Sequence, residues 1–361
     1  MRLLHVVGTR PNFVKMAPVI AALRTIDPGG RHALVHTGQH YDRMMSEIFL
    51  EELGVPEPDH MLGVGSGSHA EMLAKVLTAI EPVIEAEDPE LVILPGDVNS
   101  TLAAALAAAH MHVPIAHVEA GLRSFDRTMP EEVNRVLTDQ VSDLLFTHSP
   151  EALKNLEREG VCAERVKFVG NTMIDSLVAL RDRFTERHFC RQHGVEPGSY
   201  LLVTLHRPAL VDGELLGPAI TELSAIAAEM PVLFPVHPRT RSRLGAAADD
   251  LPDGLGLIDP VGYLDFLSLE ADARAVLTDS GGIQEETSYL GVPCFTLRDN
   301  TERPVTIESG TNVLLGLDPA RISEIPALIA QRGDGVSEPP PLWDGRAAER
   351  LAAEVAEYLK A

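Results

Sequence analysis

The chain has 361 residues, of which 45% are hydrophobic, so it is long enough for about two domains that each bury an apolar core. Its 30 basic and 53 acidic residues give a formal net charge of −23, which disfavours nucleic acid and anionic membrane surfaces as partners. Any phosphate-binding site must therefore obtain its positive charge locally.

Strand-like and helix-like segments alternate along the first half of the chain. This βαβ rhythm predicts a parallel sheet with helices on both faces, in which ligands bind at the carboxyl edge of the strands. The expected strands are 3–7, 32–35, 91–94, 115–118 and 144–146, and the expected helices are 18–23, 70–85, 102–109 and 131–142.

A helix-like segment at 173–187 and a polar turn at 194–199 are interpreted as a linker to a second series of the same kind. We therefore expect two doubly wound Rossmann-like domains facing a cleft, residues 1–170 and 171–361, with the final amphipathic helix 345–359 packing back on the first. The second series comprises strands 201–205, 232–236, 256–258, 275–277 and 294–297 and helices 219–228 and 263–269.

Cysteine usage and the first residues bear on the compartment. The three cysteines, Cys162, Cys190 and Cys294, form no CxxC pair, which is typical of a reducing compartment and argues against structural zinc. The segment 3–7 shows no secretory-signal pattern, and no apolar run approaches about 18 residues. We expect a soluble cytoplasmic protein.

The segment 277–304 reads as a strand, a turn, a short helix and a second strand. Because Gly281 and Gly282 lack a Cβ, backbone N–H groups at the helix start can approach a phosphate closely, and the helix dipole favours its charge. The alternative interpretation is a tight turn with a capping box from Ser280. The segment therefore predicts either a phosphate site or a purely structural turn.

Acids and arginines cluster in the same segment. Glu285 and Glu286 are placed where a carboxylate could accept hydrogen bonds from vicinal ribose hydroxyls, and Arg298 and Arg303 follow the second strand. The alternative is that these acids face solvent. The clustering favours a nucleotide site over a structural turn.

The loop after the first strand reads Gly-Thr-Arg-Pro-Asn-Phe-Val-Lys from residue 8. It is neither a GxGxxG dinucleotide fingerprint nor a P-loop. Arg10 and Lys15, near a helix start, could hold a diphosphate, the alternative being ordinary surface charge.

Carboxylates follow three strand or helix ends of the first half. Asp97 with Asn99 suggests a metallophosphatase, but the further Asp and His ligands are absent at suitable spacing, so we expect no metal. Glu119 ends the next strand, and Glu131 and Glu132 open a helix, where Glu132 is interpreted as a dipole partner. Three acids directed to one edge predict acid–base chemistry.

Two strands of the second half end at histidines, His206 and His237. A single histidine here is more often structural, but two facing one cleft favour an anionic ligand, with His206 preferred because Arg207 adds charge.

The motifs GTRPNFVKMAP, TGQH, GDVNST, HVEAGLRS, PEEVNR, TLHRP, VHPRT, DSGGIQEE and RDNTERP occur in this order over about 300 residues. Together they resemble the UDP-N-acetylglucosamine 2-epimerases of the non-hydrolysing type. The resemblance implies a glycosyltransferase-B-like fold with UDP held mainly by the second domain. It implies UDP contacts from Arg10, His206, Phe266, Ser280, Gly281, Gly282, Glu286 and Arg303, and a sugar side lined by Lys15, Asp97, Glu119, Glu131 and Arg135. We add His237 to the binding set and His206 and Lys15 to the candidates for catalysis.

The resemblance implies interconversion of UDP-N-acetylglucosamine and UDP-N-acetylmannosamine at C2 without a cofactor, with Asp97, Glu119 and Glu131 in acid–base roles. We also expect a homodimer and a role in polysaccharide or antibiotic sugar biosynthesis. The alternatives are a hydrolysing 2-epimerase that releases N-acetylmannosamine, an epimerase of a modified UDP-sugar, a retaining glycosyltransferase and a nucleotide-sugar sensor.

The chain departs from its relatives around a second, activating UDP-N-acetylglucosamine site that many bacterial members carry. Gln39 and His40 are present, but 41–43 reads Tyr-Asp-Arg, and the loop 63–69 has no arginine. Losing such a donor typically costs about 1.5 to 3 kcal/mol. We therefore expect hyperbolic kinetics without an added activator.

Overall fold

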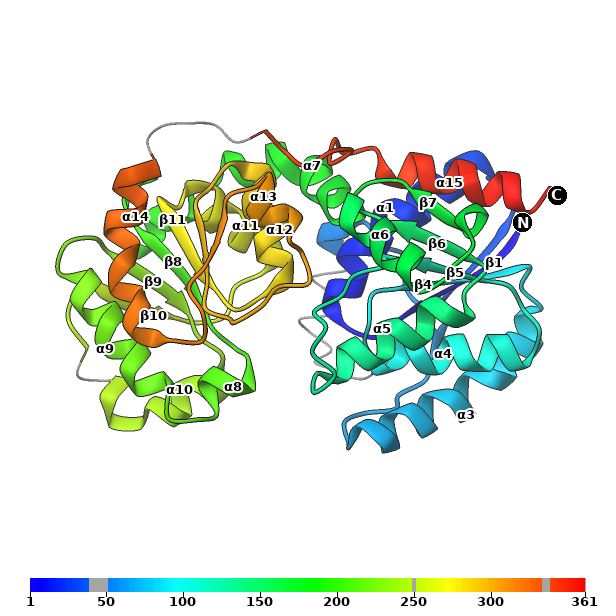
Figure 1. Cartoon of the computed structure of the whole chain (residues 1–361), viewed down its shortest axis with the longest axis horizontal. Coiled ribbons are helices and arrows are strands. Elements are labelled where there is room, and N and C mark those ends of the chain that lie inside the picture. Colours follow the sequence, from blue (N-terminus) through cyan, green and yellow to red (C-terminus); the bar gives the residue numbers. More distant parts are fainter. Residues whose placement is uncertain (39–50, 249–250, 333–337, 361) are drawn as a thin grey trace. The chain divides into compact units, whose positions relative to one another are not determined.

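The chain folds into two compact units (Figure 1). The computed structural model describes residues 1–38, 51–248, 251–332 and 338–360. The first unit comprises Met1–Ala179 and Pro341–Ala361, and the second comprises Leu180–Pro340. The expected substitutions of an activator site at residues 39–43 lie outside the described residues.

In the first unit, seven parallel strands form a sheet in the order β3-β2-β1-β4-β5-β6-β7. Alternate residues of β1 face opposite sides: Leu3 and Val7 pack against α1 and α15, whereas Leu4 and Val6 pack against α3 and α4. The strands are β1 (Arg2–Val7), β2 (Arg31–His36), β3 (His60–Met61), β4 (Leu91–Pro95), β5 (Ile115–Val118), β6 (Leu144–Thr147) and β7 (Val166–Phe168). The helices are α1 (Arg10–Ile26), α3 (His69–Glu87), α4 (Asn99–His110), α5 (Pro130–Val141), α6 (Pro150–Arg158), α7 (Thr172–Thr185) and α15 (Ala347–Tyr358).

The second unit repeats this plan with six parallel strands in the order β10-β9-β8-β11-β12-β13. Leu201 and Val203 of β8 pack toward α9 and α14, whereas Leu202 packs toward α11 and α12. The strands are β8 (Leu201–Thr204), β9 (Val232–Pro235), β10 (Leu255–Ile258), β11 (Ala275–Thr278), β12 (Cys294–Thr296) and β13 (Asn312–Leu314). The helices are α8 (Pro208–Val211), α9 (Leu216–Ala227), α10 (Pro238–Leu244), α11 (Tyr263–Asp272), α12 (Gly281–Leu290), α13 (Val305–Glu308) and α14 (Ile325–Arg332).

Both sheets have the strand order of a doubly wound Rossmann-like fold, which confirms the predicted fold class. The order reverses between β1 and β4 in the first sheet and between β8 and β11 in the second. Ligands of such sheets bind outside the carboxyl ends of the strands at this reversal. The two places to search for a site are therefore the loops that follow β1 and β4 and those that follow β8 and β11.

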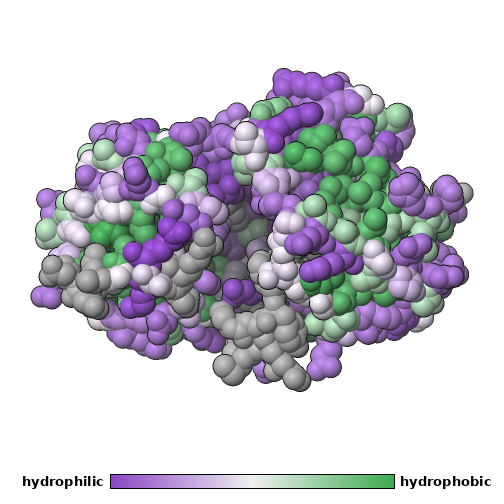
Figure 2. All heavy atoms as spheres, turned by 90° about the horizontal axis from the view of Figure 1, so that it is seen from below, coloured by the Kyte–Doolittle hydropathy of each residue, from purple (hydrophilic) through white to green (hydrophobic). Residues whose placement is uncertain are grey.

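On the face shown in Figure 2, hydrophilic residues are interspersed with hydrophobic patches. Among the described residues, no helix combines the length and the hydropathy that a membrane crossing requires.

Helix α7 carries the chain out of the first unit, and it moves the boundary from the expected residue 170 to residue 179. Its first turns belong to the first unit because the Ser176 hydroxyl donates to the Val14 carbonyl at 2.6 Å. The return segment is fixed by Trp343, whose fully buried indole N–H donates to the His148 carbonyl at 2.8 Å. The last helix, α15, then packs against α1.

Helix α1 begins at Arg10, eight residues before the expected start at residue 18. Asn12 stabilises this first turn because its side-chain oxygen accepts hydrogen bonds from the Gly8 and Thr9 amides at 3.0 and 3.1 Å. Pro11 is compatible with a first helical turn. Arg10 and Lys15 are therefore helical residues rather than parts of a loop.

Asp175 joins α7 to α15 and predicts a pH-dependent stability. Its carboxylate accepts the Ala347 and Ala348 amides at 3.1 and 2.6 Å, while burial raises its pKa to about 6. A raised pKa favours the folded state below about pH 4 and loses that contribution as the pH rises through about 6. In chemical denaturation, an Asp175→Asn variant should therefore show a larger stability deficit at pH 4 than at pH 7. An equal deficit at both pH values would contradict the assignment.

Candidate active site

At the carboxyl edge of the first sheet, the residue that follows β1 lies close to the start of α4, the helix that follows β4. A Cβ on Gly8 would lie 2.6 Å from the Ser100 hydroxyl, so only glycine lets the start of α1 approach the start of α4. The Ser100 hydroxyl is also 2.7 Å from that of Thr37. This packing presents Arg10, which is exposed, at the edge of the sheet.

Lys15 and Glu119 form a buried ion pair between α1 and the end of β5. They are only 8% and 9% exposed, so little solvent weakens the attraction. Glu119 has a backbone φ of 72°, a strained value for a residue with a Cβ, and such strain is commonly found at functional sites. Gly96 lies beside the pair, since a Cβ there would be 3.4 Å from both charged groups.

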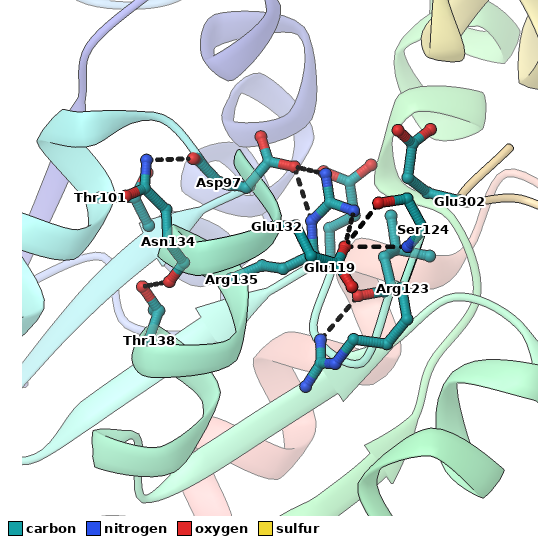
Figure 3. A network of polar contacts seen from close by, with 12 residues as sticks. Asp97, Thr101, Glu119, Arg123, Ser124, Glu132, Asn134, Arg135, Thr138 and Glu302 are labelled. Atoms are coloured by element: carbon teal, nitrogen blue, oxygen red, sulfur yellow. Dashed lines mark hydrogen bonds and ion pairs between the residues drawn. The ribbon is translucent and has the colours of Figure 1, made fainter. Parts of the chain in front are cut away.

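Asp97, after β4, is held by Arg135 of α5 (Figure 3). Both Nε and Nη2 of Arg135 donate to the same Asp97 oxygen, at 3.0 and 2.5 Å. The Asn134 amide donates to the Asp97 carbonyl at 2.9 Å and to Asn99 at 3.1 Å. The Asp97 side chain is 26% exposed, so a fixed carboxylate remains accessible to a ligand.

Glu132 has a larger role than the predicted dipole partner. Its buried carboxylate accepts the Ser124 amide and hydroxyl, the Phe125 amide and Arg135, at 2.8 to 2.9 Å (Figure 3). It therefore fixes both the loop after β5 and the arginine that holds Asp97. Its neighbour Glu131 is partly exposed on the first turn of α5.

His117, a buried residue of β5, links the loop after β4 to α5. Its Nε2 donates to the Gly96 carbonyl at 2.7 Å, and its Nδ1 lies 2.7 Å from Asp139. Burial opposes the charge of Asp139, but hydrogen bonding to His117 and the charge of Arg123 hold its pKa below the ordinary value. His117 is the first residue of the motif HVEAGLRS, but the sequence predicted no role for it.

At the second sheet, Asp279 links the ends of β8 and β11. One of its oxygens accepts the His206 and Arg207 amides at 2.9 and 2.7 Å, and the other lies 2.8 Å from the His206 ring. Burial opposes ionisation, yet these hydrogen bonds and His206 keep the pKa of Asp279 below its ordinary value. The His206 side chain remains 59% exposed. Asp279 is the first residue of the motif DSGGIQEE, for which the sequence predicted no separate role.

Helix α12 begins at the end of β11, at the predicted glycines. Ser280 occupies the N-cap position, but its side chain makes no capping hydrogen bond with a described residue, so the capping-box alternative is wrong. A Cβ on Gly281 would lie 2.4 Å from Nη1 of Arg303. The glycine therefore allows a guanidinium to lie directly against the positive end of the helix.

Glu285 and Glu286 have different partners, which corrects the expectation that both could receive a ribose. Glu285 accepts Arg303 Nε at 2.8 Å, while Glu302 is shared by Arg303 at 3.3 Å and Arg298 at 2.6 Å. This network fixes Arg303 and commits Glu285 to it. Glu286 instead accepts the Tyr263 hydroxyl at 2.7 Å, so only Glu286 remains a candidate for the ribose.

The other two predicted binding residues of the second unit lie on neighbouring elements. His237 is exposed immediately after β9, which is next to β8 in the sheet. Phe266 of α11 is partly buried and packs against the core cluster under α11 and α12. The structure thus brings the predicted sugar-side residues to the carboxyl edge of the first sheet and places His206, His237 and the α12 start at that of the second.

Comparisons with known proteins match the chain to 2-epimerases of UDP-sugars. A family model described as UDP-N-acetylglucosamine 2-epimerase matches residues 25–356. A UDP-N-acetylglucosamine 2-epimerase of Methanococcus maripaludis is 43% identical over 88% of each chain. A UDP-2,3-diacetamido-2,3-dideoxy-D-glucuronate 2-epimerase of Pseudomonas aeruginosa is 42% identical over 99% of each chain. The crystal structure of a Methanocaldococcus jannaschii UDP-GlcNAc 2-epimerase with UDP-GlcNAc and UDP matches with a TM-score of 0.90, 40% identity and coverage of 99% and 100%.

Proposed function

The chain belongs to the UDP-N-acetylglucosamine 2-epimerase family, and from this premise we propose that it interconverts UDP-N-acetylglucosamine and UDP-N-acetylmannosamine by inverting C2. The observation that carries the proposal is the pair of fixed carboxylates at adjacent strand ends, Asp97 held by Arg135 and Glu119 held by Lys15. Inversion of a carbon centre requires a proton to leave one face and another to arrive on the opposite face. Asp97 and Glu119, together with Glu131 in the first turn of α5, supply groups for that exchange.

The second unit supplies the UDP site in this proposal. The diphosphate binds at the start of α12, where backbone N–H groups, the helix dipole and Arg303 all favour negative charge. Glu286 accepts the ribose hydroxyls, and His206, fixed by Asp279, adds a donor beside the phosphates.

The order of bond changes follows from the acidity of C2–H. In a closed pyranoside no carbonyl lies next to C2, so direct removal of its proton is unfavourable. If the anomeric C–O bond breaks first, UDP departs onto the cationic site, and the cation-like sugar makes the C2 proton acidic enough for a carboxylate. Loss of that proton gives a 2-acetamidoglucal. Protonation of the other face and return of UDP to C1 complete the inversion.

Deuterium incorporation tests this route. In deuterated buffer, both UDP-N-acetylglucosamine and UDP-N-acetylmannosamine should acquire deuterium at C2, because the proton leaves to an exchangeable carboxyl group. Proton NMR of the reaction mixture measures the loss of the C2–H signal. Epimerised product that retains hydrogen at C2 would contradict proton loss to such a base. Free N-acetylmannosamine and UDP as the accumulating products would instead identify a hydrolysing enzyme.

A decorated substrate is a second candidate because the Pseudomonas aeruginosa relative, at 42% identity, is named for a diacetamido-glucuronate. The same C2 chemistry applies to it, and only the groups at C3 and C6 differ. Parallel assays with UDP-N-acetylglucosamine and with UDP-2,3-diacetamido-2,3-dideoxyglucuronate, compared by kcat/KM, distinguish the two. We further propose that the enzyme acts in the cytoplasm. We also propose that it is a homodimer, which sedimentation of the purified protein would test.

A further inference from the structure

Glu270, on α11, is a buried acid that the reaction scheme does not use. Its side chain is 0% exposed, and neither carboxylate oxygen accepts a hydrogen bond from a donor among the described residues. The group that it meets is another carboxyl, that of Glu286 on α12, which is 3% exposed. Two ionised carboxylates can only accept, so contact between them requires a proton on one.

The surroundings place that proton on Glu270. Burial, followed by the charge of Glu286, raises the pKa of Glu270 well above its ordinary value. Burial also raises the pKa of Glu286, to about 7, but Tyr263 and Glu270 donate to it and favour its ionised form. Two neighbouring acids with unequal hydrogen bonding divide into a neutral donor and a charged acceptor.

Among the described residues, no cation shifts the pKa of either carboxyl of the pair. The titratable groups around the pair are Tyr200, Tyr263, Cys294 and Glu285. All four are neutral or negative near neutral pH, and burial raises the pKa of Tyr200, Tyr263 and Cys294 further. The arginines of this region bind elsewhere: Arg303 to Glu285 and Glu302, and Arg332 to the Thr311 and Gly310 carbonyls.

We propose that Glu270 is a positioning residue that, as a neutral acid, donates a hydrogen bond to Glu286 and so orients its carboxylate to accept the ribose hydroxyls of the UDP-sugar. The inference rests on the proposed function, since it assigns a ribose to Glu286. A carboxylate offers about four acceptor positions. Tyr263 and Glu270 occupy two of them and leave two for the vicinal hydroxyls.

The test compares UDP with 2′-deoxy-UDP in calorimetric titrations. The two ligands carry the same phosphates, so the ratio of their Kd values isolates the ribose hydroxyl from phosphate titration. A hydrogen bond to a charged acceptor corresponds to a ratio of about ten or more. In the wild-type protein the ratio should rise between pH 6 and pH 8, because Glu286 becomes ionised through about pH 7.

Two substitutions separate positioning from structure. Glu270→Gln keeps a neutral donor and should leave the ratio and its pH dependence within about twofold of wild type. Glu270→Leu removes the donor, which makes Glu286 harder to ionise, so the ratio should fall severalfold at pH 7 and its rise should move to higher pH. The exposed Glu229→Gln, the same change elsewhere in the second unit, is the matched control and should change nothing.

Each outcome bears on a different claim. Retention of the wild-type ratio and pH dependence by Glu270→Leu would overturn the inference, as would an identical loss in Glu270→Gln and Glu270→Leu. UDP that fails to bind the wild-type protein would contradict the proposed function itself. A protonated-carboxyl infrared band that disappears in Glu270→Gln and persists in Glu229→Gln would support the neutral acid directly.

Discussion

Asp97→Asn, Glu119→Gln and Glu131→Gln variants should each turn over the UDP-sugar about a hundredfold or more slowly, while UDP affinity stays nearly unchanged. An amide has nearly the shape of the acid but cannot take a proton from C2. Apart from Arg10, the UDP contacts are assigned to the second unit, whereas these acids belong to the first, so the loss should appear in kcat. Single-turnover rates and calorimetric UDP titrations measure the two effects separately.

The matched control for these variants is Glu164→Gln, an exposed acid of the same unit. It should retain wild-type turnover. Because Glu119→Gln leaves Lys15 buried without its anionic partner, the thermal unfolding of each variant must be measured as well. Wild-type turnover in all three carboxamide variants would disprove the site assignment. Loss of UDP affinity parallel to kcat would indicate a binding role instead.

The two-unit fold was predictable because its strands are short apolar runs between turn residues, repeated twice. The segments 3–7 and 201–205 each contain a single polar residue, His5 and Thr204. Neither segment alternates between polar and apolar residues, as expected for strands that are buried on both faces. The starts and ends of the helices were less predictable. Helix α1 begins at Arg10 because the Asn12 side chain accepts hydrogen bonds from the Gly8 and Thr9 amides. This contact is local, but it uses an asparagine where the usual capping-box pattern has Glu or Gln.

The acids and arginines at the strand ends were predictable from position, but their partners were not. Glu131 and Glu132 are adjacent and chemically identical, yet only Glu132 is buried beneath Ser124 and Arg135. Glu285 and Glu286 are both buried but have different partners, Arg303 and Tyr263, because successive helical residues point in directions about 100° apart. Which neighbour faces the core depends on packing, and the core is assembled from segments distant in sequence.

Replacement of Gly281 by alanine should weaken UDP binding at least about tenfold. The added Cβ would lie 2.4 Å from Nη1 of Arg303, well inside van der Waals contact. The guanidinium cannot move aside freely, because Glu285 and Glu302 hold it at 2.8 and 3.3 Å. Either the arginine or the first turn of α12 must shift, and both contribute to the proposed diphosphate site.

This substitution is a sharper probe than Arg303→Ala, which would leave the buried Glu285 and Glu302 short of a cation and destabilise the fold. Gly217→Ala is the matched control, since Gly217 also lies in the first turn of a helix, α9, and a Cβ there meets no atom within 4 Å. It should bind UDP as the wild-type protein does. Calorimetry with UDP and with uridine completes the test, because the loss should be confined to the ligand that carries phosphates. Equal weakening of uridine and UDP in Gly281→Ala would show that the helix start does not bind the diphosphate.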